Sequence, residues 1–387
     1  MADLIITLKG IKFNVCFYSN DVLRKECDKM ERGNAKIVIV VLVILIILAG
    51  GFLGYKIVEK NGKNIETANE QSSDNDVLVT GLSKKEEKQV QIYKGNDRPI
   101  AVMIDNHNQA WPQVGLQKAY MVYEAIAEGG ETRLMALFKG VDVEQIGPVR
   151  SARHYFLDYA MENDAIYVHF GWSPQAKSDI KKYFINNING IEEDGTTFWR
   201  TKKKSAPHNA LTSTEKILKS AENKKYRTTS TKESVLNYVT DEVNLEDGQS
   251  AISITIPHSK LQIVTYEYDA KNKVYNRIAR KKAQTDWTTG ENLTTKNIIV
   301  TMCDNSNLND GENKGRQTLQ NIGTFDGYYL TNGKAIKIKC IKNARDEQTV
   351  YKDLHGNEIK VNDGNTWVNI CPTDAKIVIE GETEAGV

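Results

Sequence analysis

The segment 98–106, RPIAVMIDN, decides the fold of this chain. It contains an apolar run of strand length at 100–104, followed directly by Asp105, Asn106 and His107. An apolar run of this length is typical of a β-strand. In an α/β domain, residues that follow a strand lie outside the carboxyl end of the sheet, where ligands usually bind. The segment therefore predicts the first strand of a domain and one part of a candidate site.

Helices and strands alternate in the residues that follow. The turn at 128–131 lies between two apolar segments of strand length, so it predicts a hairpin. Ser151 is the expected N-cap of the next helix, whose apolar residues recur with helical spacing. Because strands alternate with helices, we predict an α/β domain over residues 98–235. Its expected strands are 119–126, 133–138 and 165–170, and its expected helices are 151–161, 175–185 and 212–222.

The pattern changes near residue 248. Short segments of alternating apolar and polar residues are separated by turn residues at hairpin-like intervals, which is typical of antiparallel strands. We therefore predict a second, mostly β domain over residues 248–377. Its expected strands are 251–256, 262–269, 273–279, 297–302, 327–330, 335–340, 349–353 and 366–370.

An uncharged segment, IVIVVLVILIILAGGFLGY, occupies residues 37–55. A helix of this length, at about 1.5 Å per residue, crosses a hydrocarbon core of roughly 30 Å. The segment has no polar face, unlike most helices of globular proteins. We therefore predict one transmembrane helix over 37–56, a cytoplasmic segment over 1–36 and a flexible polar stalk over 57–97. The long C-terminal portion is expected outside the cytoplasm.

Two details concern the anchor. Met30 opens a short charged stretch directly before the apolar segment, as a signal-anchor begins, and our hypothesis is that translation starts there. A lipoprotein signal would need a cysteine at the position of Gly51, and no clear cleavage site follows. We therefore expect an uncleaved single-pass anchor in the cell membrane.

Composition excludes several classes of protein. The chain has 51 Lys and Arg against 50 Asp and Glu, so no overall basic field favours nucleic acid. Its five cysteines are scattered and form no C-x-x-C pair, which argues against a disulfide framework and against a zinc site. The cysteines beyond the apolar segment are expected to be buried free thiols. No metal site is predicted, and no motif specifies a cofactor.

The densest group of charged residues is GPVRSAR at 147–153. A Gly-Pro turn there places Arg150, Ser151 and Arg153 at a predicted helix N-terminus. Free N–H groups and the helix dipole favour an anion at such a place, and arginine binds phosphate or carboxylate in bidentate fashion. We predict ligand-binding roles for these three residues together with Asp105, Asn106, Glu128 and Arg133. In the alternative interpretation, the arginines form ion pairs with Asp105, Glu124 or Glu128 that only stabilise the domain.

Four residues are candidates for catalysis. Asp105 and Glu124 could handle a proton, and His169 and His208 could act as general acid or base because imidazole titrates near neutrality. The alternative interpretation makes Asp105 a turn residue and both histidines hydrogen-bonded structural groups. No nucleophile elbow or complete triad is present, so a reaction does not follow from the sequence.

Several of these motifs resemble the YerB-type lipoprotein family of Gram-positive bacteria, a two-domain family of unknown function. The resemblance covers roughly residues 98–375 and implies a protein of the cell envelope. This chain departs from it by lacking the lipobox cysteine. The resemblance rests on residues 98–106, VYEA at 122–125, EGG at 128–130, IGPVRSAR at 146–153, DAIYVH at 164–169, SPQA at 173–176, APHN at 206–209, and on 315–316, 333–336 and 366–368 in the second domain.

Three functions remain open from the sequence. The first is a membrane-anchored extracytoplasmic protein that binds a phosphate- or carboxylate-bearing envelope ligand, such as a cell-wall precursor. The second is a non-catalytic scaffold or receptor that docks wall polymer or another envelope protein. The third is an envelope enzyme acting on phosphorylated wall precursors. They differ in whether the acids, arginines and histidines converge in one concave site.

Overall fold

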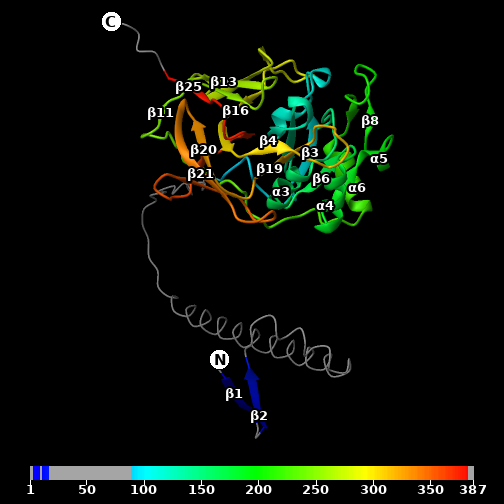
Figure 1. Ribbon diagram of the computed structural model, residues 1–387, viewed down its shortest axis with the longest axis vertical. Coiled ribbons are helices and arrows are strands. Elements are labelled where there is room, and N and C mark those ends of the chain that lie inside the picture. The colour runs from blue at the N-terminus through cyan, green and yellow to red at the C-terminus, as the bar shows by residue number, and fades with distance from the viewer. Residues whose placement is uncertain (1–2, 9–10, 17–88, 382–387) are drawn as a thin grey trace, which may run out of the picture. The chain divides into compact units, whose positions relative to one another are not determined.

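The computed structural model describes residues 3–8, 11–16 and 89–381. The chain divides into two units, Met1–Lys84 and Lys85–Val387. In the first unit, strands β1 (Asp3–Leu8) and β2 (Ile11–Cys16) form an antiparallel pair. The other described elements belong to the second unit (Figure 1).

A mixed sheet of eleven strands runs through the second unit. Its central strands β3 (Ile100–Asp105), β4 (Met121–Ile126) and β5 (Thr132–Phe138) are buried at every position. A strand covered on both faces needs a continuous apolar run, which the sequence supplies at 100–104. The other strands are β6 (Ile166–His169), β7 (Asn187–Asn189), β11 (Gln249–Ser250), β17 (Asn297–Met302), β20 (Gly323–Thr331), β21 (Lys334–Lys342), β22 (Val350–Asp353) and β24 (Thr366–Cys371). Their order is β11-β21-β20-β17-β24-β4-β5-β3-β6-β7, with β22 beside β21.

The two halves of the sequence share this sheet. β24 pairs in parallel with β4, from Thr366 opposite Met121 to Ile370 opposite Ala125. The expectation of an α/β domain followed by a distinct mostly β domain is therefore corrected, because strands of both halves are hydrogen-bonded into one mixed sheet. Periodicity identifies strands but does not reveal which strands pair across long sequence separations.

A second, six-stranded sheet covers one face of the long sheet. Its Ile254, Val264 and Tyr266 share one buried cluster with Val102 and Leu134 of the long sheet. Alternate residues of its strands are buried, in agreement with the alternating pattern of the sequence. The strands are β12 (Ser253–Pro257), β13 (Ile263–Asp269), β14 (Val274–Ala279), β15 (Lys282–Ala283), β16 (Thr294–Thr295) and β25 (Val378–Glu380).

Three helices cover further parts of the long sheet. α3 (His154–Glu162) and α4 (Pro174–Lys182) pack on the face opposite the second sheet, where Phe156 and Ile180 join a second buried cluster. α6 (Thr214–Asn223) shares the first cluster through Ile217. Smaller elements are α5 (Gly190–Glu193), η3 (Asn108–Ala110), η4 (Leu116–Lys118), η5 (Glu128–Gly130) and the strand pairs β8 (Trp199–Arg200) with β9 (Ala210–Leu211), β10 (Tyr238–Val239) with β23 (Val361–Asn362), and β18 (Asn305–Asn307) with β19 (Gln317–Leu319).

Every strand and helix expected in 98–377 has a counterpart, with bounds that differ by a few residues. One start is wrong: α3 begins at His154 with Arg153 as its N-cap residue, and Ser151 lies before the cap. The other two long helices carry side-chain caps, since Ser173 Oγ accepts from Ala176 N and Ser213 Oγ accepts from Lys216 N. Both fit the preference for serine at this position.

The described residues contain no helix long and apolar enough to cross a membrane. Their longest helix, α6, has 10 residues, whereas a span needs about 20. The transmembrane helix expected over 37–56 gains no support from the structure, because those residues lie outside the described part. The fold class is corrected accordingly, to a mixed-sheet protein whose described residues include no membrane-crossing helix.

The described last residues of the predicted stalk belong to the second unit and pack within it. The backbone N–H groups of Gln91 and Ile92 donate to the carboxylate of Asp363, each at 2.8 Å. Tyr93 packs edge-on against Tyr120, with ring centroids 5.3 Å apart. The apolar side chains of residues 92 and 93 contribute buried area to this contact.

The cysteines of the second unit behave as the sequence predicts. Cys303, Cys340 and Cys371 are buried and free. Burial raises the pKa of each thiol to about 12, so all three remain protonated at neutral pH.

His154, at the contact between α3 and β19, is expected to make the stability of the protein depend on pH. Its Nε2 lies 3.1 Å from Thr318 Oγ1, and its buried Nδ1 has no hydrogen-bond partner in the described residues. Burial lowers the pKa of His154 to about 4, against an ordinary value near 6.5. Between these values the unfolded chain binds the proton more readily. The stability from His154 is therefore complete above pH 6.5 and is lost as the pH falls towards 4.

We expect His154→Gln to reduce this acid sensitivity, by at most about 3 kcal/mol between pH 7 and about pH 4. Nearby Asp158, whose pKa burial raises to about 6, acts in the opposite direction in both proteins. Urea unfolding of wild type and variant at both pH values measures the difference. The exposed His355, changed to Gln, is the control. Equal acid sensitivity in the wild type and His154→Gln would show that His154 does not titrate in this way.

Candidate functional site

The segment 147–153 is fixed against the carboxyl end of β3 by main-chain hydrogen bonds. Asp105 N donates to Pro148 O at 2.8 Å, and Arg150 N donates to Met103 O at 2.8 Å. On its other side, Val149 N donates to Ala210 O at 2.7 Å. The position of the Arg150 main chain is therefore determined by strand-like pairing on both sides.

Asp105 is the centre of the charged group at this end of the sheet. Its Oδ2 lies 2.7 Å from His208 Nδ1 and 3.2 Å from Arg150 Nε. The carboxylate is almost fully buried, whereas the Arg150 side chain is 27% exposed. Asp105 thus orients one imidazole and one guanidinium, and Arg150 is the member that reaches solvent.

Arg133 extends the group across the sheet. It lies opposite Asp105 in the register of β3 and β5, so both side chains point to the same face. Arg133 Nη1 donates to Ser151 O at 2.9 Å, and its Nη2 lies 3.5 Å from Glu128 Oε2. Burial and, second to it, the charge of Arg153 lower the pKa of Arg133 to about 10.

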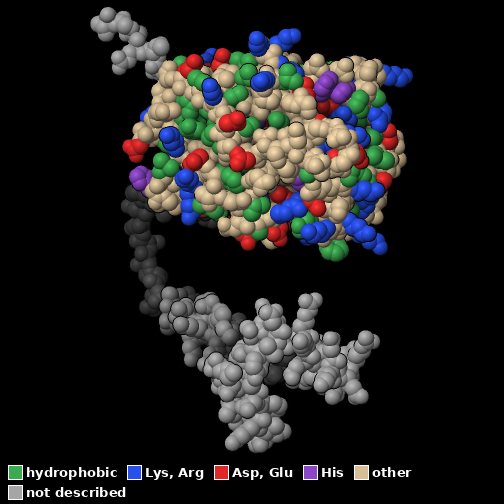
Figure 2. Space-filling view, viewed as in Figure 1, with side chains coloured by type: hydrophobic (Ala, Val, Ile, Leu, Met, Phe, Trp, Pro, Cys, Tyr) green, Lys and Arg blue, Asp and Glu red, His purple; other side chains and the backbone are tan. Residues whose placement is uncertain are grey.

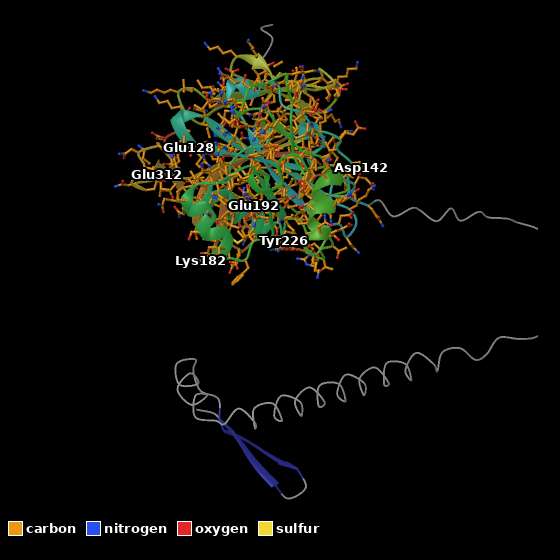
Figure 3. The ribbon with its side chains drawn as sticks, turned by 90° about the vertical axis from the view of Figure 1, so that its right-hand side faces the viewer. Glu128, Asp142, Lys182, Glu192, Tyr226 and Glu312 are labelled. Carbon is orange, nitrogen blue, oxygen red and sulfur yellow. The ribbon has the colours of Figure 1, made fainter. Side chains whose placement is uncertain are left out.

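Glu128, in the hairpin between β4 and β5, neutralises part of this charge. Its Oε1 lies 2.5 Å from Arg153 Nε. Burial would raise the pKa of Glu128, but its bonds to Arg153 and Arg133 outweigh that and hold the pKa below its ordinary value. Figure 3 shows Glu128 towards one side of the unit and Asp142, beyond the far end of β5, towards the other.

The arginines outnumber the acids in this group, which we call the arginine site: Arg133, Arg150 and Arg153 against Asp105 and Glu128, with His208 alongside. Three buried polar atoms here have no hydrogen-bond partner in the described residues: Arg133 Nε, Tyr167 OH, and Arg150 Nε, whose contact with Asp105 is an ion pair at 3.2 Å. Tyr167 is close enough for Arg133 and Arg153 to influence its pKa, which burial raises. Unpartnered buried donors cost stability unless something accepts from them. An anion would satisfy both the charge and the donors.

The N-terminus of α3 lies at the same place. Arg153 is its N-cap residue, and no side chain caps the helix there. Uncapped N–H groups and the helix dipole favour negative charge, in addition to the arginines. The carbonyl oxygen of Ser151 accepts from Arg133 and helps to position it, whereas a ligand-binding role for Ser151 stays a prediction.

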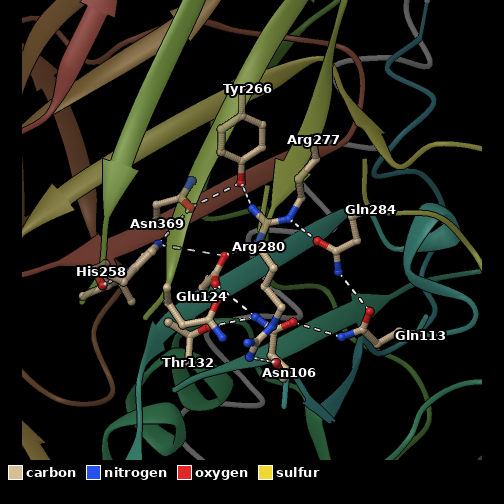
Figure 4. Close-up of polar contacts among 12 residues, drawn as sticks. Asn106, Gln113, Glu124, Thr132, His258, Tyr266, Arg277, Arg280, Gln284 and Asn369 are labelled. Atoms are coloured by element: carbon tan, nitrogen blue, oxygen red, sulfur yellow. Dashed lines mark hydrogen bonds and ion pairs between the residues drawn. The ribbon is translucent and has the colours of Figure 1, made fainter. Parts of the chain in front are cut away.

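Glu124 and Asn106 do not join the arginine site. Neighbouring residues of a strand point to opposite faces, so Asn106 diverges from Asp105. Asn106 Nδ2 donates to Thr132 Oγ1 at 2.7 Å and to Glu124 Oε1 at 3.3 Å, on the face covered by the second sheet. Figure 4 shows these residues inside a polar network between the two sheets.

Arg277 of β14 is the charge partner of Glu124 in this network. Its Nη2 lies 2.5 Å from Glu124 Oε2, and both side chains are buried. Arg277 also stacks on Trp367, 4.0 Å from the ring centroid. Burial would raise the pKa of Glu124, but Arg277 and His258 outweigh it and leave the pKa below its ordinary value. Glu124 is thus a structural acid, and its predicted catalytic role has no geometric support.

Sequence reasoning did not single out Arg277. The alternation of β14 could have done so, because Tyr275, Arg277 and Ala279 share one face of the strand, and that face is buried. An arginine on the apolar face of an alternating strand indicates a buried acid opposite it. The identity of that acid, more than 150 positions away, is not readable from one sequence.

His169 is also structural. It is fully buried, with Nδ1 2.7 Å from Gly171 O and Nε2 3.1 Å from Asn187 Oδ1. Burial lowers its pKa, so it stays neutral. With both ring nitrogens engaged, His169 has no free atom for acid–base chemistry.

Within the described ranges, no three His, Cys, Asp or Glu side chains come together in a way that could hold a metal ion. The arginine site has the wrong chemistry for a cation, since guanidinium groups dominate it. His208 uses Nδ1 for Asp105, which leaves Nε2 as the atom that could face a ligand.

The fold and site together define a class: a protein of two sequence halves, joined through one mixed sheet, with a basic site at the carboxyl end of a central strand. Residues 79–227 match the N-terminal domain, and residues 252–368 the C-terminal domain, of a family described as "Protein of unknown function (DUF3048)". The chain belongs to the DUF3048 family, which confirms the resemblance to YerB-type proteins.

Two comparisons with a Bacillus subtilis protein, one of sequence and one of structure, support this assignment. The chain is 33% identical over 294 residues to "Putative lipoprotein YerB" of Bacillus subtilis (strain 168), covering 74% of this chain and 85% of that protein. The crystal structure of YerB protein from Bacillus subtilis is similar with a TM-score of 0.66 at 32% identity, covering 76% of this chain and 97% of that one.

Proposed function

We propose that this protein binds an anionic, phosphate- or carboxylate-bearing ligand at the arginine site. The observation that carries the proposal is the excess of arginine over acid there, with Arg133 Nε and Tyr167 OH buried and unpartnered. Charge-assisted hydrogen bonds from guanidinium groups are among the strongest polar contacts. Arg150, the partly exposed member, is the entry point for the anion.

The place of action we propose is the cell envelope, outside the cytoplasm and at the membrane. The support comes from the name of the Bacillus subtilis relative, which describes a lipoprotein class. The ligands we consider are therefore the phosphates and carboxylates of cell-wall precursors and polymers.

Titration of the purified full-length protein with inorganic pyrophosphate tests the anion site. We expect saturable binding that Arg150→Ala weakens about 10- to 100-fold, because one charge-assisted contact is worth about 1.5–3 kcal/mol. Arg150→Lys keeps the charge but loses the planar fork, so its affinity lies between the two.

Arg227 provides the matched control for this titration. It also pairs with an aspartate, with Nη2 2.7 Å from Asp164 Oδ1, but Asp164 follows the C-terminal end of α3, whereas the arginine site lies at the N-terminus of that helix. Arg227→Ala should bind pyrophosphate like the wild type. Equal affinities for wild type and Arg150→Ala, with both proteins folded, would refute the anion site.

The Asp105–His208 pair favours a second candidate, an enzyme acting on phosphorylated wall precursors. A carboxylate bonded to Nδ1 fixes the tautomer of an imidazole and leaves Nε2 available for proton transfer, as in many hydrolases. Under this proposal, incubation with a phosphodiester releases phosphomonoester in wild type but not in His208→Gln. Absence of turnover in wild type would leave binding as the function of the site.

A further inference from the structure

A hollow of about 500 Å³ lies beside the arginine site. Its wall combines Asn108 and Trp111, from the connection after β3, with Lys202, Lys203 and Lys204, from the loop between β8 and β9. Trp287, from the loop between β15 and β16, closes it from the C-terminal half of the chain. Binding sites commonly form where two parts of a protein meet.

Trp287 is held in place by contacts on both sides of it in the chain. Trp287 N donates to Gln113 O at 2.7 Å. The carboxylate of the preceding Asp286, which is buried, accepts from Gly115 N at 2.7 Å. A half-buried indole fixed in this way is a rigid surface for a ligand, and it loses little conformational entropy on binding.

Lys204 places an ammonium group between the main chain of residues 110–112 and the Trp287 ring. Its Nζ donates to the carbonyls of Ala110, Trp111 and Pro112, at 2.8–2.9 Å, and lies 4.9 Å from the Trp287 ring centroid. Lys202 and Lys203 are exposed at the rim. The hollow therefore combines aromatic surface, ammonium groups and the amide of Asn108.

The hollow continues into the arginine site through two histidines. His208, bonded to Asp105, stacks on His107 with ring centroids 4.6 Å apart and an angle of 14°. His107 Nδ1 in turn accepts from Gln109 N at 3.2 Å, and residues 108 and 109 line the hollow. Figure 2 shows that basic and acidic side chains are interspersed on the visible face, so this local basic concentration is not part of a general field.

We propose that the hollow binds the sugar of a glycosyl phosphate whose phosphate occupies the arginine site. This inference rests on the proposed function and adds the chemical class of the ligand. The C–H face of a pyranose buries apolar area against an indole, and its hydroxyl groups exchange hydrogen bonds with the exposed ammonium groups of Lys202 and Lys203 and the amide of Asn108. The ligand thus extends from Arg150, past the stacked histidines, to Trp287.

Affinities for N-acetylglucosamine 1-phosphate and inorganic phosphate, measured on the full-length protein, test this inference. We expect the sugar phosphate to bind more tightly. Trp287→Ala should lower the affinity for the sugar phosphate roughly tenfold, because stacking on one aromatic ring is worth about 1–3 kcal/mol. The affinity for inorganic phosphate should not change. Trp287→Phe, which keeps an aromatic face, should retain most of the affinity and shows that the loop is folded.

Trp199 is the matched control, a half-buried tryptophan with Lys216 Nζ 6.0 Å from its ring but outside the hollow. Trp199→Ala should bind both ligands like the wild type. The inference is overturned if the two ligands bind the wild type equally, if Trp287→Ala weakens both alike, or if uridine monophosphate binds better than the sugar phosphate. Failure of the anion site is distinguishable, because Arg150→Ala would then leave inorganic phosphate binding unchanged.

Discussion

Replacing Arg277 with leucine is expected to destabilise the protein by about 3–5 kcal/mol, because it leaves Glu124 as an uncompensated buried charge. Glu124 is fully buried, and Arg277 is its only arginine or lysine partner among the described residues. The pair joins β4 of the N-terminal half to β14 of the C-terminal half. Urea unfolding followed by tryptophan fluorescence measures the change.

Two controls separate charge from packing. The double variant Glu124→Leu with Arg277→Leu removes both charges and should regain a large part of the loss, since buried pairs replaced together by apolar residues are often near neutral. Lys273→Met breaks an exposed pair with Glu242, directly before β14, and should change stability by less than about 1 kcal/mol. A loss in Arg277→Leu as small as that in Lys273→Met would contradict a buried, structural Glu124.

The second large effect is expected for Lys342→Met, on the opposite face of the long sheet. Lys342 Nζ lies 2.7 Å from Glu162 Oε2, and both side chains are almost completely buried. Glu162 belongs to α3, whereas Lys342 ends β21, so this pair also joins the two halves. We expect a loss of about 3–5 kcal/mol for the same reason as for Arg277.

Glu162 accepts hydrogen bonds from further groups, and these bonds affect the size of the expected loss. Its carboxylate also accepts from Tyr123 OH and Thr349 Oγ1, each at 2.7 Å. These neutral donors keep the carboxylate hydrogen-bonded but supply no counter-charge, so they reduce the loss without removing it. Lys339, which lies on the same strand as Lys342, forms an exposed pair with Asp326 of β20. Lys339→Met is therefore the control and should change stability by less than about 1 kcal/mol. Equal effects of the two lysine variants in urea unfolding would show that Lys342 is not holding the halves together.

Both pairs explain why the halves of the chain form one unit. Each half alone would expose a buried charge and an unpaired strand edge at β4 or β24. The two family domains, matched at 79–227 and 252–368, are therefore separate in sequence and continuous in structure.

Local patterns were sufficient to predict the elements. The run at 100–104 predicted β3, and the alternation at 273–279 predicted β14. The same patterns could not predict that β4 pairs with β24, because the free energy of that pairing depends on residues about 245 positions apart, which share no local period.

The candidate site was predicted in part. Asp105, Glu128, Arg133, Arg150 and Arg153 converge as expected, and His208 joins them through Asp105. Asn106 and Glu124 were placed wrongly because the alternation of a strand sends them to the other face. The strand that ends at His169 was predicted correctly. The burial of His169 and its two hydrogen-bond partners could not be predicted from the residue type.

The most direct test of the account is where an anion binds. Crystals of the protein soaked in tungstate, a heavy tetrahedral analogue of phosphate, would show the position by anomalous scattering. We expect a peak within hydrogen-bond distance of Arg133 Nε and the Arg150 guanidinium. A peak only at exposed lysines, or none at the arginine site while that site is open to solvent in the crystal, would contradict it.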